Sequence, residues 1–232
     1  MPVLLRWCSI TPMNSLYEIL NSFLLVYAAL FPIINPVGGA PIFLGFTRHC
    51  SDKERHTLAR RVAFNGFLLL LGSLLAGSHV LEFFGITIPV LRIAGGLVVT
   101  SFAWNLLQRG QEVDGSGDTS KPVGPVDAFY PLTMPLTIGP GSMSVAITLG
   151  SQRPKGITDL AMLAGVGGGA IAGLFAVALT VYLCYRFAER IVSVLGENGS
   201  NVLIRLSAFI LVCIGIQILW NGISSLPSIP TH

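Results

Sequence analysis

The sequence predicts an all-α, polytopic membrane protein with six transmembrane helices, arranged as two inverted repeats of three helices in which the first helix of each repeat is broken. Three observations lead to this prediction: the composition, six long apolar stretches, and one Pro/Gly interruption in each half. The 232 residues are 52% hydrophobic and 11% charged, with a mean hydropathy of +0.72. Soluble domains do not have this balance.

The six apolar stretches define a single transmembrane domain. Most of them are near the roughly 20 residues that a helix needs to cross a bilayer. They cover residues 16–46, 62–80, 88–107, 128–149, 160–187 and 202–223. The chain is accordingly divided into an N-terminal tail (1–15), a first repeat (16–109), a linker rich in Gly, Ser, Asp and Pro (110–127), and a second repeat (128–223).

The first span is interrupted near its centre by Asn35, Pro36, Gly38 and Gly39. Proline removes a backbone donor and glycine weakens a helix, so the span should break here. In hydrocarbon, a broken backbone is stable only where protein buries it or where it lines a wet cavity. Pro41 suits the first turn of the half-helix that resumes after the break. A kink made only for packing is the alternative.

The second and third spans follow with ordinary helical signals. Ser51 and Glu54 fit a capping box, which predicts that a helix starts at this point and continues into the span 62–80. Arg92 opens the third span. It is a candidate for binding a substrate carboxylate or locking a gate, and snorkelling to the headgroups is the alternative.

The second break lies in the fourth span, at Thr137, Gly139, Pro140, Gly141 and Ser142. Gly139 or Ser142 is the expected N-cap of the half-helix that follows. Gly/Pro interruptions at corresponding places in two halves are the best sequence indication of a transporter's binding site. Free amides after a break favour an anion, and free carbonyls before it favour a cation. Together they suit a small zwitterion.

The last two spans complete the second repeat. The run Gly165 to Gly169 lies in an apolar span and predicts close helix packing. Gly196 followed by Arg205 echoes Gly85 followed by Arg92, which makes the two arginines a candidate pair. Three spans per half reverse the orientation of the second half in the membrane, as in many secondary transporters.

The distribution of basic residues predicts the topology. If loops 1–2, 3–4 and 5–6 share one side, that side holds nine basic residues: Arg48, Lys53, Arg55, Arg60, Arg61, Arg109, Lys121, Arg186 and Arg190. The opposite side holds Arg6, Arg153 and Lys155. The positive-inside rule then places both termini in the periplasm.

Four sequence runs strongly resemble the MarC family of integral membrane proteins. They are NPVGGAPIF (35–43), DKER (52–55), FGITIPVLRIAGG (84–96) and PLTMPLTIGPGS (131–142). The resemblance covers about residues 16–223 and implies six spans in a bacterial inner membrane. Some relatives look like transporters of small neutral amino acids; the antibiotic-resistance locus in the family name does not establish drug efflux. Thr133 and Thr137 stand where relatives often carry apolar residues, which bears on the substrate.

These observations predict an inner-membrane secondary transporter of a small polar solute, with a neutral amino acid as the expected substrate. Its partners are the lipid bilayer and the solute, and a homo-oligomer is left open. The sequence has no catalytic residue set, metal-ligand cluster, cofactor motif or nucleotide site, and no nucleic-acid partner is expected. The alternative is a membrane structural or stress-associated protein without a transported substrate.

Overall fold

A computed structural model describes residues 12–109, 127–152 and 160–226 of the chain as an all-helical molecule. The elements are α1 (Pro12–Ile34), α2 (Pro36–Phe46), α3 (Asp52–Phe83), α4 (Ile88–Arg109), the π-helix η2 (Leu132–Thr137), α5 (Pro140–Ser151), α6 (Leu160–Arg186) and α7 (Ala188–Ser224). Within these ranges there is no β-strand, and five helices are long and apolar enough to cross a membrane: α1, α3, α4, α6 and α7.

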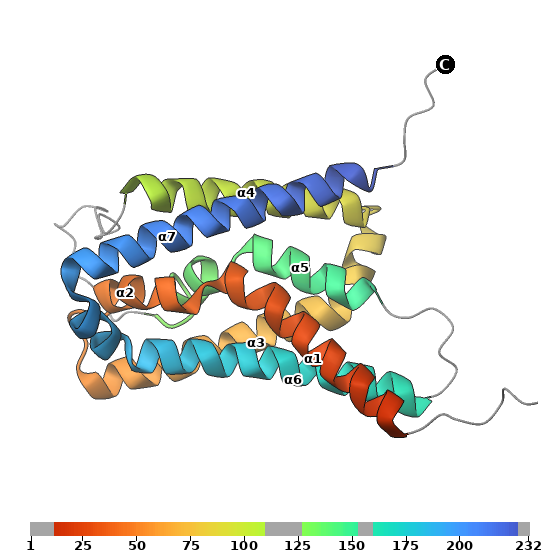
Figure 1. Ribbon diagram of the computed structural model, residues 1–232, viewed down its shortest axis with the longest axis horizontal. Coiled ribbons are helices and arrows are strands. Elements are labelled where there is room, and N and C mark those ends of the chain that lie inside the picture. Colours follow the sequence, from red (N-terminus) through yellow and green to blue (C-terminus); the bar gives the residue numbers. More distant parts are fainter. Residues whose placement is uncertain (1–11, 110–126, 153–159, 227–232) are drawn as a thin grey trace, which may run out of the picture.

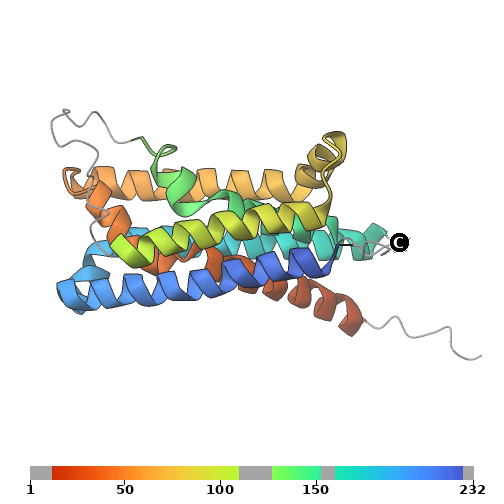
Figure 2. The same ribbon diagram turned by 90° about the horizontal axis from the view of Figure 1, so that it is seen from above.

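The helices lie roughly along one axis, and the two broken spans run between the others (Figure 1). α1 runs from one end of the molecule to its middle, and α2 continues to the opposite end. η2 and α5 make a similar two-part path in the reverse direction, and Figure 2 shows the same arrangement from above. The start of α1 and the end of α7 lie at the same end, which we call the terminal end.

Several predicted boundaries shift in the structure. The helix predicted to start at residue 16 already begins at Pro12, inside the predicted tail. The rest of that tail (1–11), most of the linker (110–126) and the loop 153–159 lie outside the described residues. The fourth span, predicted to be broken, consists of the π-helix η2 and the short helix α5, and its helical part begins at Leu132, not at residue 128. The sixth begins well before residue 202, because α7 is helical from Ala188 and kinks at Gly196 (φ 66°).

The capping box at the start of α3 is confirmed. The Ser51 hydroxyl accepts a hydrogen bond from the Glu54 amide at 3.4 Å, and the Ser51 amide donates to Glu54 Oε2 at 2.8 Å. Arg55, one turn further on, is buried and has a structural role beyond topology. Its guanidinium donates to the Thr47 carbonyl at 3.2 Å and pairs with Glu189 at the start of α7. Arg55 on α3 therefore links the end of α2 in the first half of the chain to the start of α7 in the second half.

Small residues bring two helix pairs into close contact. A Cβ on Gly96 of α4 would lie 2.6 Å from the Leu219 amide nitrogen of α7, and one on Gly169 of α6 would lie 2.4 Å from the Ile19 carbonyl oxygen of α1. Both neighbours are backbone atoms, so the glycines allow helices to approach as they do in many membrane bundles. The predicted packing role of the glycine run is confirmed at Gly169, whereas Gly167 and Gly168 have no neighbour within 4 Å.

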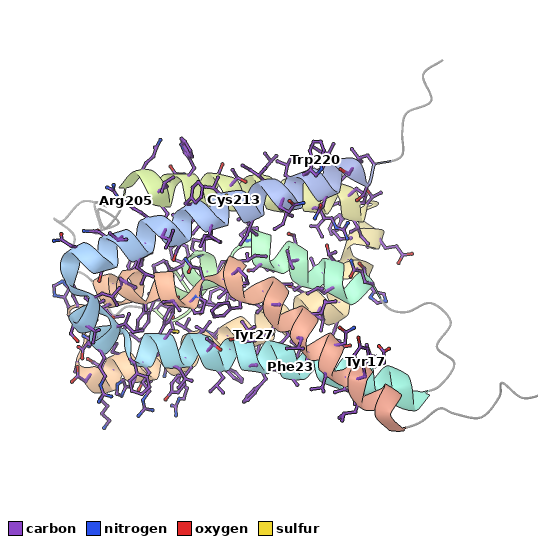
Figure 3. All side chains as sticks on the ribbon, in the orientation of Figure 1. Tyr17, Phe23, Tyr27, Arg205, Cys213 and Trp220 are labelled. Carbon is purple, nitrogen blue, oxygen red and sulfur yellow. The ribbon has the colours of Figure 1, made fainter. Side chains whose placement is uncertain are left out.

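Large apolar side chains cover the outside of the bundle. Phe175 of α6, Phe209 of α7 and Trp220 of α7 are all more than half exposed, and Figure 3 shows the outward side chains, with Trp220 labelled. In water such a surface would be an aggregation hazard. It fits a molecule whose solvent over most of its length is lipid.

Candidate functional site

The first break is made by Asn35, which separates α1 from α2. Asn35 adopts a left-handed conformation (φ 49°), which asparagine tolerates better than most residues, and its Oδ1 accepts a hydrogen bond from the Gly38 amide at 3.2 Å. Pro36 is therefore the first residue of α2. The expectation that Pro41 opens the helix is wrong, because the Asn35 cap starts the helix five residues earlier and Pro41 lies inside it.

The glycines of the first break pack against protein. A Cβ on Gly38 would come within 2.8 Å of the Ser207 hydroxyl of α7, and one on Gly39 within 2.9 Å of the Tyr185 hydroxyl of α6. Their small size is needed for the approach of α6 and α7. Asn35, Pro36, Gly38 and Gly39, predicted to bind substrate, do not line the cavity at the second break, and at the two glycines the neighbouring side chains occupy the space that a Cβ would take.

The second break runs from the π-helix η2 to the start of α5. Gly139 is the N-cap, in extended conformation, and Pro140 is the first helical residue, so one of the two predicted N-caps is confirmed. Ser142 does not cap; its hydroxyl donates to the Gly139 carbonyl at 2.9 Å. Because glycine has no capping side chain, no side-chain hydrogen bond closes the first turn of α5.

Tyr185 joins the two breaks from α6. The buried Thr137 hydroxyl donates to the Leu132 carbonyl at 2.7 Å, so the hydrogen bond of 2.9 Å between Thr137 Oγ1 and Tyr185 Oη uses the tyrosine proton. The tyrosine ring stacks on Phe43 of α2, with ring centroids 4.4 Å apart. This fully buried side chain thus contacts both the helix after the first break and the turn before the second.

A cavity of about 80 Å³ lies at the second break, and we call it the break cavity. It is lined by residues 135–137 and 139–142, by Ile33 in the last turn of α1, and by apolar side chains of α4 and α7. The first broken span contributes Ile33 to this cavity, whereas Asn35 to Gly39 do not line it. A Cβ on Gly141 would strike Val99 at 1.9 Å, whereas one on Gly139 meets only the Pro135 carbonyl at 3.6 Å.

A larger cavity of about 620 Å³ lies towards the terminal end, between α1, α4, α5 and α7; we call it the terminal cavity. Ile33 lines both cavities, so they adjoin. Arg92 lines the terminal cavity, and its guanidinium donates to the Ser225 hydroxyl at 3.4 Å. Arg205 is exposed on α7, in the half of that helix away from the terminal end (Figure 3), and lines neither cavity. The structure does not bring the two arginines together.

Three side chains near the broken spans were not singled out from the sequence: Tyr185, which links the two breaks, and Thr148 and Asn221. Tyr185 ends an apolar span, where an aromatic residue normally indicates the membrane interface. Thr148 lies within α5 and resembles any apolar-face threonine, and Asn221 near the end of α7 has the pattern of an interhelical hydrogen-bonding group. Thr148 and Asn221 both line the terminal cavity. No local pattern distinguishes them, because their positions depend on how neighbouring helices are aligned.

The fold defines the class of this protein as an integral, multi-pass, helical membrane protein with two interrupted spans and a small cavity at the second break. The family model described as "MarC family integral membrane protein" matches residues 20–226. The chain belongs to the MarC family.

Named relatives agree with this assignment. The chain is 33% identical over 207 residues to a UPF0056 membrane protein of Buchnera aphidicola, covering 89% of this chain and 93% of the relative. It is 30% identical over 209 residues to a UPF0056 membrane protein of Pyrococcus abyssi, with coverage of 89% and 96%. It is also 33% identical over 201 residues to the UPF0056 inner membrane protein MarC of Escherichia coli, with coverage of 84% and 90%. No solved structure matches the chain.

Proposed function

We propose that this MarC-family protein is a secondary carrier of the bacterial inner membrane that moves a small polar solute, with a neutral amino acid as the expected substrate. One observation carries the proposal: the start of α5, which no side chain caps, lines the break cavity at mid-depth in the bundle. A packing kink needs no such cavity, and an interrupted backbone that lines one is typical of transporter binding sites.

The chemistry of the break cavity suits a small zwitterion. The first amides of a helix have no intrahelical acceptor, and they share a partial positive charge of roughly +0.5 with the helix dipole. At α5 these include the amides of Gly141 and Ser142, which line the cavity. The π-helix η2 ends at Thr137, and the last carbonyls of a helix have no intrahelical donor, so the Leu136 carbonyl is an acceptor for an ammonium group at the cavity.

We further propose that the two halves are inverted repeats, in which α1 and α2 correspond to η2 and α5, α3 corresponds to α6, and α4 to α7. The packing supports this pairing: α3 contacts α6 and α4 contacts α7, while the contact of α2 with α7 mirrors that of α5 with α4. Gly85 and Gly196 support it too, because both have positive φ and precede the last span of their half.

The basic residues set the proposed orientation. The ends of α2 and α4, the start of α3 and the junction of α6 with α7 lie together at the end opposite the terminal end, and they carry most of the nine basic residues (Figure 1). We assign that end to the cytoplasm. The terminal end, with the start of α1, the end of α7 and the terminal cavity, is then periplasmic.

The test is uptake and efflux by reconstituted vesicles against a panel of the proteinogenic amino acids and small organic acids, with and without ion gradients. We expect accumulation of at least one small neutral amino acid above empty vesicles. If no solute in the panel moves in either direction, the carrier proposal fails and the structural or stress-associated alternative stands.

A further inference from the structure

The terminal cavity has features of a ligand site that the break cavity does not share. Among the described residues, its lining includes one cation, Arg92, and no carboxylate, together with Thr148 and Asn221. Towards Ile33 the lining becomes apolar, with Ala29, Ile214 and Ile218. The cavity therefore has a polar, positively charged part and an apolar part that adjoins the break cavity.

The alignment of α4 with α5 places Arg92 and Thr148 at one depth. The two helices run in opposite directions (Figure 1), and a Cβ on Gly95 of α4 would lie 2.1 Å from the Ser144 hydroxyl of α5. Arg92 is three residues from Gly95 towards the terminal end, and Thr148 is four residues from Ser144 in the same direction. At about 1.5 Å per residue, their levels differ by roughly 1.5 Å.

The alignment of α4 with α7 places Asn221 at this depth too. A Cβ on Gly222 would lie 2.9 Å from the backbone nitrogen of Ile93, the residue after Arg92. Asn221 is the neighbour of Gly222, and it lines the same cavity as Arg92 and Thr148. Three polar side chains from three helices thus surround the cavity at one level.

Arg92 and Asn221 have hydrogen-bond donors left for a ligand, and the hydroxyl of Thr148 is unpaired within the described part of the chain. Thr148 is 8% exposed, and its buried hydroxyl has no hydrogen-bond partner among the described residues. Gln217 donates to Asn221 Oδ1 at 2.9 Å, which leaves the Nδ2 hydrogens of Asn221 to donate elsewhere. Arg92 has five N–H donors, and its bond to Ser225 uses one of them. The Thr148 hydroxyl has almost no accessible surface, so a ligand oxygen reaches it only when the side chain turns towards the cavity, and the cost of a buried hydroxyl without a partner favours that turn.

We propose that the terminal cavity is a second binding site, which takes the carboxylate of a small soluble acid or amino acid between Arg92, Thr148 and Asn221. A single guanidinium matches the single charge and the planar two-oxygen geometry of a carboxylate. The apolar part of the cavity accommodates the remainder of the solute. In the proposed carrier this site receives the solute before it reaches the break cavity, so the assignment of a carried solute rests on the proposed function, whereas carboxylate binding does not.

The experiment uses thiol labelling in detergent, without any transport readout. The cysteines at positions 8, 50, 184 and 213 are replaced by serine, and Thr148→Cys is purified in dodecyl maltoside. Its labelling rates with an anionic and a cationic methanethiosulfonate of similar size are compared. We expect the anionic reagent to react at least 10-fold faster, and 50 mM acetate or alanine, but not alaninamide, to slow it several-fold.

Matched variants separate the site from general effects. Arg92→Gln should abolish both the preference and the protection, and Arg92→Lys, which keeps the charge but loses the planar fork, should retain the preference with weaker protection. Arg60→Gln, an exposed arginine of α3 outside both cavities, should change neither. Thr87→Cys, exposed in the turn before α4, should label without protection.

Three outcomes overturn the proposal: no labelling of the cysteine at position 148, equal rates for both reagents, or protection by phosphatidylglycerol but not by acetate, which would identify a lipid headgroup as the occupant. Failure of the carrier proposal is distinguishable. Carboxylate protection without vesicle transport removes the carrier and leaves this site, whereas alanine transport without protection removes this site and leaves the carrier.

Discussion

The glycines at the second break distinguish a ligand cavity from a packing kink. Gly139 and Gly141 lie two residues apart and both line the break cavity. A Cβ on Gly139 has only the Pro135 carbonyl at 3.6 Å, an ordinary contact, whereas one on Gly141 strikes Val99 at 1.9 Å. Gly139→Ala therefore fills the cavity without a collision, and Gly141→Ala disturbs the contact between α5 and α4.

The magnitudes follow from these neighbours. Alanine is a poorer N-cap than glycine, but it also reduces the entropy of the unfolded chain, so Gly139→Ala should change stability by less than about 1 kcal/mol. Overpacking at Gly141 should cost about 1–3 kcal/mol. The cavity of about 80 Å³ has room for roughly two or three waters at about 30 Å³ each. A methyl group takes a large share of it, and we expect Gly139→Ala to lower transport at least about 10-fold, or roughly 1.4 kcal/mol.

The assay measures uptake of the solute that the parent protein transports, normalised to folded protein recovered in the vesicles, alongside thermal unfolding in detergent. Gly139→Ala should lose transport at parental stability, and Gly141→Ala should lose stability. Parental transport by Gly139→Ala would refute the ligand cavity. If transport in both variants falls only as far as the amount of folded protein falls, the second break is a kink made for packing.

Three further predictions test the helix packing, the arginines and the orientation. Gly169→Ala should destabilise the protein by about 1–3 kcal/mol in thermal or denaturant unfolding, because its neighbour is the α1 backbone, whereas Gly168→Ala should be neutral or slightly stabilising; equal effects would contradict the packing. Arg92→Lys and Arg205→Lys should each lower vesicle transport if the arginines are an equivalent functional pair, and parental rates in both would leave snorkelling as their role. Ser51→Cys, in a background without native cysteines, should be labelled only from the cytoplasmic side. If an impermeant reagent labels it in intact cells, the proposed orientation is wrong.

The features that the sequence predicted correctly are those with a local cause. Hydropathy identifies the membrane helices because lipid requires an apolar surface over a fixed length. Pro36, Pro140 and Gly139 mark the breaks because a missing donor or missing side chain acts within one turn. The capping box at Ser51 is likewise a contact across three residues.

The surroundings of the breaks were decided only by the tertiary structure. The sequence does not distinguish Gly38 and Gly141 from Gly139. Of these three, only Gly139 has room for a side chain, because α7 approaches Gly38 and α4 approaches Gly141. Thr148 and Arg92 share a cavity only because α5 and α4 align Ser144 with Gly95. The composition and the spacing of apolar residues determine which face of a helix is apolar. The alignment of two neighbouring helices along their axes depends on how their side chains pack, and it determines which residues come together in a site.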